Sequence, residues 1–256
     1  MTNPEFKRNL WLELSPQRLV LMPAVLGVIA VLTFFLSQGS NPAKVLLAVF
    51  ASLGFLLVGA WGSFTAMASI NSEVAERTWD QQRLSALSPW QMAWGKLLGA
   101  NIYPWFGGLI CAAVVLASGL VGSGNPARVV CLLLSGIVGC LALHCWIMAS
   151  RLHTMDVHAA GNNSALVKRL FAIYVLLQIL PGIFFVLVGQ YFGGHTSTTS
   201  WWGLQLSFSS LCLLIACLML ALGLLALWRT MSTQLMVRTT PWAWALGCTA
   251  VGLIVA

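Results

Sequence analysis

Apolar residues along the chain fall into long runs that short hydrophilic segments separate. A bilayer core of about 30 Å needs roughly 20 apolar residues in helical form. The runs that reach this length predict spans at 19–37, 45–70, 97–121, 129–150, 170–192 and 204–228. The pattern therefore predicts an all-α, polytopic helical membrane protein. We expect about six transmembrane helices in a single domain over residues 1–256.

The chain closes with a further apolar segment, 242–256, which is short. About 15 helical residues at roughly 1.5 Å each do not cover a bilayer core. Three interpretations stay open: a thin seventh span, an interfacial segment, or the start of a longer region. The side of the membrane on which the C-terminus lies stays open with them.

The hydrophilic segments alternate between uncharged and charged ones, and this alternation predicts the orientation. With the N-terminus in the cytoplasm, eleven of the thirteen Lys and Arg residues fall on the inside, and only Lys44 and Arg128 fall outside. Membrane proteins carry such an excess of positive residues on the cytoplasmic side. We expect a multi-pass protein of a bacterial inner membrane, the bacterial origin being inferred from the compactness of the chain.

Composition agrees with the hydropathy pattern. Charged residues are 7% of the chain, against about 25% in soluble domains. The net charge of +7 is spread along the chain rather than gathered in one patch, so no nucleic-acid partner is expected. All seven cysteines lie in apolar runs, which predicts small buried side chains rather than a disulfide framework.

The N-terminal stretch 4–14 is amphipathic. Its apolar residues recur every four positions: Phe6, Leu10 and Leu14. Such a helix lies in the headgroup region with Lys7 and Arg8 toward anionic lipid, so membrane lipid is an expected partner. Ser15-Pro16 would then end this interfacial helix and begin the first span, giving an elbow. A disordered tail is the alternative.

Segment 71–96 concentrates charge in a chain where charge is scarce. Two charge pairs have helical spacing: Glu73–Arg77 and Asp80–Arg83. They predict a short helix over about 73–86. Residues 88–91 follow as a capping box, in which Ser88 caps the next helix and Gln91 reaches back to its amide. The alternative is a solvated loop that only carries positive charge on the inside.

Four short motifs stand in and beside this segment: Glu76-Arg77-Thr78-Trp79-Asp80, Leu84, Leu87-Ser88-Pro89-Trp90 and Gly95-Lys96-Leu97-Leu98. Together they resemble the permease subunits of type-2 ABC exporters. In that family an acidic–basic helix precedes a Leu-Ser-Pro-like turn and a Gly-Lys-Leu-Leu entry to the third span. The resemblance covers about residues 73–98 in motif. In architecture it extends to the interfacial helix, the spans and the inside termini, and the tail 242–256 departs from it.

The resemblance implies a half-transporter. This chain would pair with a second copy or a similar permease subunit, and each would dock on a separate nucleotide-binding ATPase subunit through 71–96, the cytoplasmic coupling loop. ATP and magnesium would be bound by that partner, and no cofactor by this chain. The residues expected to couple to the ATPase are Glu76, Arg77, Trp79, Asp80, Arg83, Ser88 and Pro89.

The chain lacks the residues that would bind a nucleotide. A P-loop needs a glycine five positions before its Gly–Lys pair and Ser or Thr after it. Trp90 and Leu97 occupy those positions around Gly95-Lys96. The group His153–His158 offers too few ligands for a metal site, and no HExxH motif is present. We therefore expect no catalytic or metal residues and no enzyme activity by this chain alone.

A few polar residues stand inside the predicted spans: Asn101, Tyr103, His144 and Gln178. His144 is ionisable, and ionisable groups within a membrane are candidates for function. The others lie near Pro104 and Pro181, where broken backbone can line a path between helices. Two interpretations stay open for this set, a substrate path and plain interhelical hydrogen bonding.

The uncharged spans disfavour an ion path or a proton-coupled pump. They are compatible with an amphipathic, lipid-like, peptide or drug-like substrate of an ATP-driven exporter, or with a mechanical role. Two other functions stay open. One is a membrane-embedded enzyme acting on a lipid-linked substrate, and the other is a scaffold subunit of a membrane complex.

Overall fold

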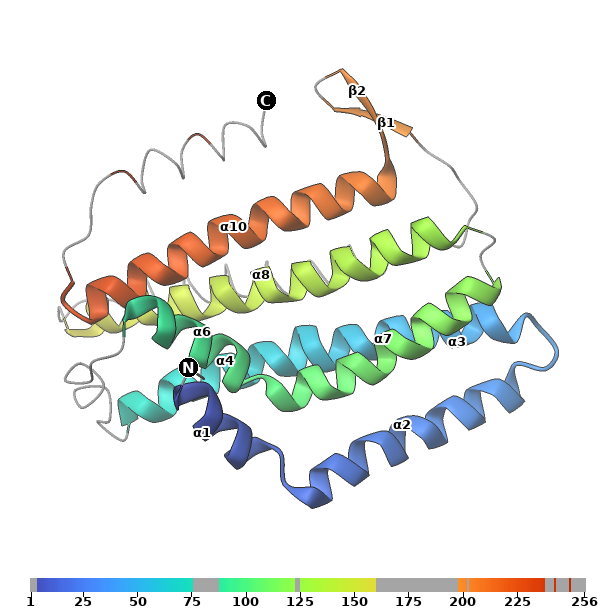
Figure 1. Ribbon diagram of the computed structural model, residues 1–256, viewed down its shortest axis with the longest axis horizontal. Helices are drawn as coiled ribbons and strands as arrows, with labels where there is room; N and C mark the ends of the chain where they lie inside the picture. Colours follow the sequence, from blue (N-terminus) through green and yellow to red (C-terminus); the bar gives the residue numbers. More distant parts are fainter. Residues whose placement is uncertain are drawn as a thin grey trace.

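The structure, a computed structural model, is a set of long helices that lie side by side (Figure 1). It describes residues 4–75, 88–122, 125–159, 198–201 and 203–237, together with 242 and 249. Five helices are long and apolar enough to cross a membrane: Pro16–Leu36, Pro42–Glu73, Ile102–Gly122, Pro126–Thr154 and Phe208–Gln234. The predicted all-α, polytopic membrane fold is confirmed. The predicted span 170–192 and almost all of the tail 242–256 lie outside the described residues.

Four of the helices begin where a capping residue precedes a proline. They are α2 (Pro16–Leu36), α3 (Pro42–Gly54), α6 (Pro89–Gly99) and α8 (Pro126–Ala159). In each, the side-chain oxygen of the cap accepts a hydrogen bond from the amide three residues further on. Proline adds no orphan amide at such a start. The predicted starts after Ser15 and Ser88 are confirmed, and the starts after Asn41 and Asn125 follow the same pattern.

The N-terminal helix α1 (Pro4–Glu13) joins α2 at an angle (Figure 1). Arg18 of α2 closes the bend, because its Nη1 lies 2.7 Å from Glu13 Oε2 and also donates to the Glu13 carbonyl at 3.3 Å. The predicted elbow at Ser15-Pro16 is therefore present in the structure.

The second span is longer than the predicted 45–70 and contains a π-helix. It runs as α3, then η1 (Phe55–Trp61), then α4 (Gly62–Ala75). A π-helix shifts the hydrogen-bond register by one residue, is rare, and is often found at functional sites. Glycines at its boundaries, Gly54 and Gly62, weaken the preference for regular α-helix there.

The third span, predicted over 97–121 with broken backbone near Pro104, is interrupted just before that proline. α6 ends at Gly99, and α7 (Ile102–Gly122) begins after a turn. Pro104 has no amide, so it cannot complete the helical bond to the carbonyl of Ala100. The side chain of Asn101 instead donates to the Leu97 carbonyl at 3.1 Å, which satisfies a backbone group beside the break.

The last described span begins later than predicted. Residues 204–207 were expected to be its first turn, but they form β2 (Leu204–Ser207), which pairs antiparallel with β1 (Thr198–Trp201). Gly203 turns the chain between the strands with φ +76°, a conformation that glycine adopts without strain. Ser207 then caps α10 (Phe208–Gln234). The predicted range 204–228 began four residues too early, because hydropathy does not separate a short apolar strand from helix, and α10 continues beyond it to Gln234.

Small residues allow the helices to approach closely. A Cβ at Gly54 of α3 would lie 3.1 Å from the Cβ of Cys111 on α7. A Cβ at Gly223 of α10 would lie 3.0 Å from the Cβ of Cys145 on α8. Within a membrane such small-residue contacts replace the hydrophobic effect as the source of packing. Cys111 and Cys145 are buried as predicted, whereas Cys217 is exposed.

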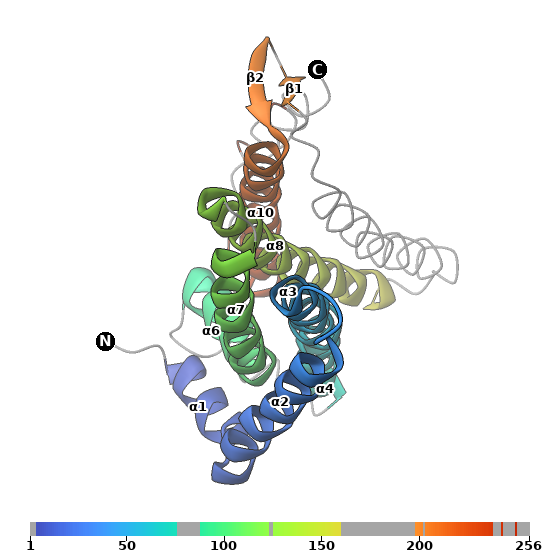
Figure 2. The same ribbon diagram turned by 90° about the vertical axis from the view of Figure 1, so that its right-hand side faces the viewer.

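The buried side chains form two clusters, one of α2, α3 and α7, and one toward the end of the bundle where α6, the end of α4 and the end of α10 lie, beside α1 (Figures 1 and 2). We call this end the α1 end, and the opposite one, with β1 and β2, the hairpin end. One buried cluster joins α4, α6, α8 and α10 and includes Ile70, Leu97, Met148 and Leu227. In contrast, most apolar side chains of α2 are exposed, which suits contact with lipid.

Candidate functional site

Three charged residues from three helices meet at the α1 end. Lys96 of α6 donates from Nζ to both carboxylate oxygens of Glu73 on α4. Arg8 of α1 approaches the same carboxylate, with Nη2 3.6 Å from Oε1. The side chains of Lys96 and Glu73 are 2% and 11% exposed, and that of Arg8 is 55% exposed. We call Arg8, Glu73 and Lys96 the charged cluster.

The charged cluster joins both sides of segment 76–87. Glu73 lies close to the end of α4 before this segment, and Lys96 lies on α6 after it. Removing two charges from water costs several kcal/mol per ion, on the order of what their attraction returns. A pair in this place holds two helices in one arrangement more than it adds stability.

Sequence reasoning missed the charged cluster. It predicted Glu73 to pair with Arg77 along one helix, and Arg77 lies outside the described residues. The partner found here, Lys96, is 23 residues away in the chain, and no helical spacing points to it. The scarcity of acidic residues was the available signal, since a buried lysine next to a span requires a carboxylate or another strong acceptor.

The capping box predicted after segment 76–87 is confirmed. Ser88 Oγ accepts from the Gln91 amide at 3.2 Å, and Gln91 Oε1 accepts from the Ser88 amide at 3.1 Å. Pro89 is the first residue of α6. The other residues expected to couple to an ATPase subunit lie outside the described part of the chain: Glu76, Arg77, Trp79, Asp80 and Arg83.

Replacing the capping serine should weaken the start of α6. We expect Ser88→Ala to lower the free energy of unfolding by about 1 kcal/mol, because an amide of the first turn loses its acceptor. Ser88→Asp keeps an acceptor at the same position and should recover most of this loss. Unfolding of the purified protein by titration with sodium dodecyl sulfate would measure both. Equal stability of Ser88→Ala and wild type would contradict the role of the box.

A second polar site lies inside the spans, where α8 meets η1. His144 is fully buried, and its Nε2 lies 2.9 Å from the carbonyl oxygen of Val58. The Trp105 ring meets the His144 ring edge to face, with 6.0 Å between their centroids. Gly62 makes room for the imidazole, because a Cβ there would lie 2.8 Å from His144 Nε2. We call Val58, Gly62, Trp105 and His144 the histidine site.

The other polar residues predicted within the spans meet the same stretch of the second span. Asn101 Oδ1 accepts from Thr65 Oγ1 at 2.6 Å. Tyr103 contacts Trp61 edge to face at 5.5 Å between ring centroids, and Arg18 lies over the Tyr103 ring at 5.4 Å. Asn101, Tyr103 and His144 thus contact positions 58–65. Gln178 lies outside the described residues.

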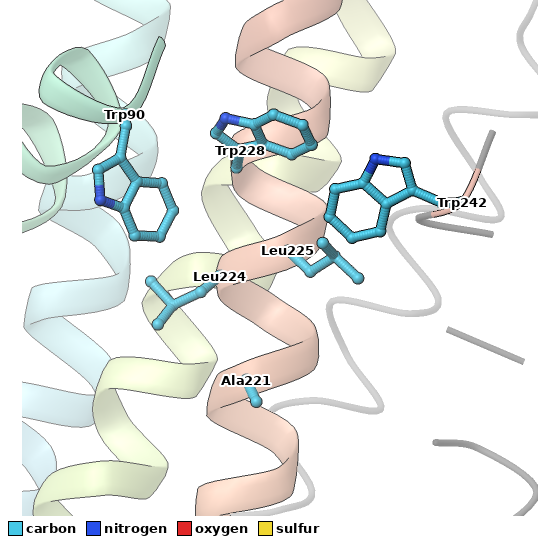
Figure 3. A pocket seen from close by; sticks show the side chains of 6 residues that line it. All are labelled: Trp90, Ala221, Leu224, Leu225, Trp228 and Trp242. Carbon is cyan, nitrogen blue, oxygen red and sulfur yellow. The ribbon is translucent and has the colours of Figure 1, made fainter. Parts of the chain in front are cut away.

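An apolar groove of about 310 Å³ opens near the α1 end (Figure 3). Figure 3 shows Trp90 of α6 on one side of α10 and Trp242 on the other. The lining residues are Trp90, Ala221, Leu224, Leu225, Trp228 and Trp242. Of these residues the sequence pointed only to Trp90, as part of the motif Leu87-Ser88-Pro89-Trp90. Indoles beside aliphatic side chains are typical of the boundary between lipid tails and headgroups.

Metal-binding side chains do not gather in the part of the chain that is described. No three His, Cys, Asp or Glu residues lie close enough there to hold an ion, and His153 is exposed on α8. Compared with known protein families, with curated proteins and with solved structures, the chain matches none of them. Its function therefore has to be inferred from the charged cluster, the histidine site and the spans.

Proposed function

We propose that this chain is the permease subunit of an ATP-binding cassette exporter. It would couple ATP hydrolysis by a separate nucleotide-binding subunit to the outward movement of a substrate. The observation that carries the proposal is the charged cluster, since Lys96 and Glu73 join the two helices that flank segment 76–87. This segment has the sequence features of a coupling loop, and its two ends are held together.

Such a joint suits the transfer of rigid-body movement. A push on segment 76–87 would move α4 and α6 together, because the buried ion pair links them. These helices share a packed cluster with α8 and α10, in which Ile70, Leu97, Met148 and Leu227 are fully or almost fully buried. Packed elements respond by moving between discrete arrangements rather than by bending. Closure of an ATPase dimer could thereby switch the packing of four helices.

The N-terminal helix would move with the same joint. Arg8 reaches Glu73, and the side chain of Asn9 packs on Gly99 of α6 so closely that a Cβ at Gly99 would lie 2.7 Å from Asn9 Nδ2. α1 therefore contacts both a residue beside the coupling segment and the helix that follows it. As an interfacial helix, it would hold the joint at the level of the lipid headgroups.

The remaining parts of the proposal follow from this arrangement. The α1 end would face the cytoplasm of a bacterial inner membrane, where the ATPase subunit binds ATP and magnesium. A second copy of this chain or a similar permease would complete the transporter. The polar residues along the second span, Asn101, Tyr103 and His144, would line the substrate path together with Gln178. The uncharged character of the spans favours an amphipathic or lipid-like substrate.

Co-purification with an ATPase subunit tests the proposal. The chain would be co-expressed with the soluble ATPases that its genomic neighbourhood encodes and then extracted in detergent. We expect a stable complex with ATPase activity. Glu76→Lys/Asp80→Lys should abolish binding or uncouple the activity, because it reverses two charges of the proposed contact surface.

Lys44→Glu serves as the matched control. Lys44 is exposed at the hairpin end, and a negative charge there agrees with the expected orientation. It should leave complex and activity unchanged, and all variants should elute from a sizing column as wild type does. Failure to retain any ATPase, or equal binding by the charge-reversed variant, would contradict the proposal. The lipid-linked enzyme and the scaffold would then become the leading functions.

A further inference from the structure

Two buried polar atoms in the histidine site lack hydrogen-bond partners. Among the buried side-chain nitrogen and oxygen atoms of the described residues, they are Trp105 Nε1 and His144 Nδ1. The two rings that carry them are in edge-to-face contact. An unpaired buried polar group costs about 1–3 kcal/mol, and such a group in a native protein calls for an unseen partner. Two of them on rings in contact point to one shared partner.

The hydrogen-bonding character of both atoms follows from their surroundings. The Val58 carbonyl can only accept, so His144 Nε2 carries the hydrogen of that bond. A fully buried imidazole within a membrane span is favoured in its neutral form, because a charge there is expensive. His144 Nδ1 is then a bare acceptor. The indole nitrogen of Trp105 is a donor only.

A single hydroxyl group has the one acceptor and the one donor that these two atoms require. Its oxygen accepts from Trp105 Nε1, and its own hydrogen is donated to His144 Nδ1. A cation cannot accept the hydrogen bond that Trp105 Nε1 donates. A carboxylate has no hydrogen to donate to His144 Nδ1. We infer that the histidine site binds one neutral O–H group between Trp105 and His144.

The local backbone positions the His144 ring for binding. The Val58 carbonyl that orients His144 belongs to η1, where the π-helical register changes which carbonyls find helical partners. Gly62, the first residue after η1, leaves the space in which Nε2 reaches this carbonyl. Nε2 thus holds the imidazole in place, while Nδ1 stays available to accept a hydrogen bond.

The hydroxyl can come from two sources that share this chemistry. One is a resident water molecule, which buried polar groups commonly hold. The other is the hydroxyl of a transported molecule, and this source rests on the proposed function. Either way the site discriminates for a neutral group that both accepts and donates.

Nuclear magnetic resonance of the protein in detergent micelles tests the inference without any ATPase partner. The chain would be labelled with ¹⁵N at histidine and tryptophan. The two signals would be assigned from His144→Gln and Trp105→Phe, with Trp105→Tyr as the replacement if the phenylalanine variant does not fold. We expect the Trp105 indole proton to be shifted downfield and to show a cross-peak to water. His144 should carry its hydrogen on Nε2, with Nδ1 at the resonance of a hydrogen-bonded acceptor.

Added n-octanol, with n-octane as control, distinguishes the two sources. If octanol removes the water cross-peak and octane does not, while the indole proton of Trp105 stays shifted downfield, the site is open to substrate hydroxyls. A cross-peak that octanol leaves unchanged supports a resident water. Trp105→Phe should shift His144 Nδ1 toward an unbonded acceptor, whereas Trp146→Phe should not, since the Trp146 indole already donates to the Met219 carbonyl at 3.3 Å.

Two results would overturn the inference. The first is an unshifted Trp105 indole proton without a water cross-peak, both with and without octanol. The second is a His144 ring that carries its hydrogen on Nδ1. Either result leaves the proposed transport function standing, because complex formation with an ATPase is measured separately.

Discussion

Glu73→Gln should destabilise the protein by about 3–5 kcal/mol, the usual effect of removing one member of a buried ion pair. The substitution takes the anion from Lys96, whose side chain is 2% exposed, and from Arg8 as well. Lys96→Met should have a smaller effect, because Glu73 keeps Arg8 within 3.6 Å. The double variant should lose less stability than the sum of both changes, because it removes both charges of the buried pair and leaves neither one without its partner. Titration with sodium dodecyl sulfate would give the three free energies of unfolding.

A second ion pair of this chain provides the matched control. Glu13 and Arg18 also form a close pair at the elbow, but their side chains are 40% and 48% exposed. Exposed pairs contribute about 0–1 kcal/mol, so Glu13→Gln should change stability far less than Glu73→Gln. Similar losses for both variants would mean that Lys96 and Glu73 are not held together away from water. The charged cluster could then not act as a joint between α4 and α6.

Gly62→Ala should disrupt the histidine site. The added Cβ would lie 2.8 Å from His144 Nε2 and 2.9 Å from Cε1, so the imidazole must move and its bond to the Val58 carbonyl is lost. Overpacking of a core costs about 1–3 kcal/mol, and the lost hydrogen bond adds about 0.5–1.5 kcal/mol. The same detergent titration would measure the loss. The ¹⁵N spectrum of His144 would report whether the Nε2 bond is broken.

Two further variants separate a local clash from a general effect of alanine. Gly139→Ala lies on α8, where a new Cβ has nothing within 4 Å. It should be neutral, or more stable by up to about 1 kcal/mol from helix propensity. Gly62→Ala combined with His144→Ala should cost little beyond His144→Ala alone, because the clashing ring is gone. Additive losses in the double variant would show that Gly62 serves something other than the imidazole.

Local signals in the sequence were sufficient for helix starts and for the elbow. A cap residue and the proline after it act through amides within three positions, so Ser15-Pro16, Asn41-Pro42, Ser88-Pro89 and Asn125-Pro126 could be interpreted without a fold. Hydropathy was sufficient for the presence of spans but less so for their ends. It extended the last span into β2, because Leu204 and Leu206 are apolar in either conformation.

The residues of the candidate sites also divide into those that the sequence indicated and those that only packing revealed. The sequence indicated Asn101, Tyr103 and His144 because polar residues are rare within its apolar runs. That all three contact residues 58–65 of the second span depends on how α7 and α8 pack. Trp105 was missed, because an indole in a span is ordinary until its nitrogen is found buried without a partner.

The sequence by itself determined that this chain is a multi-pass helical membrane protein and where most of its helices begin. These properties follow from hydropathy and from hydrogen bonds between near neighbours. Only the tertiary structure decided that Glu73 pairs with Lys96, that η1 faces His144 and that the third span breaks before Ile102. Such pairings join residues far apart in the chain. Their energies depend on burial, which exists only once the helices have packed.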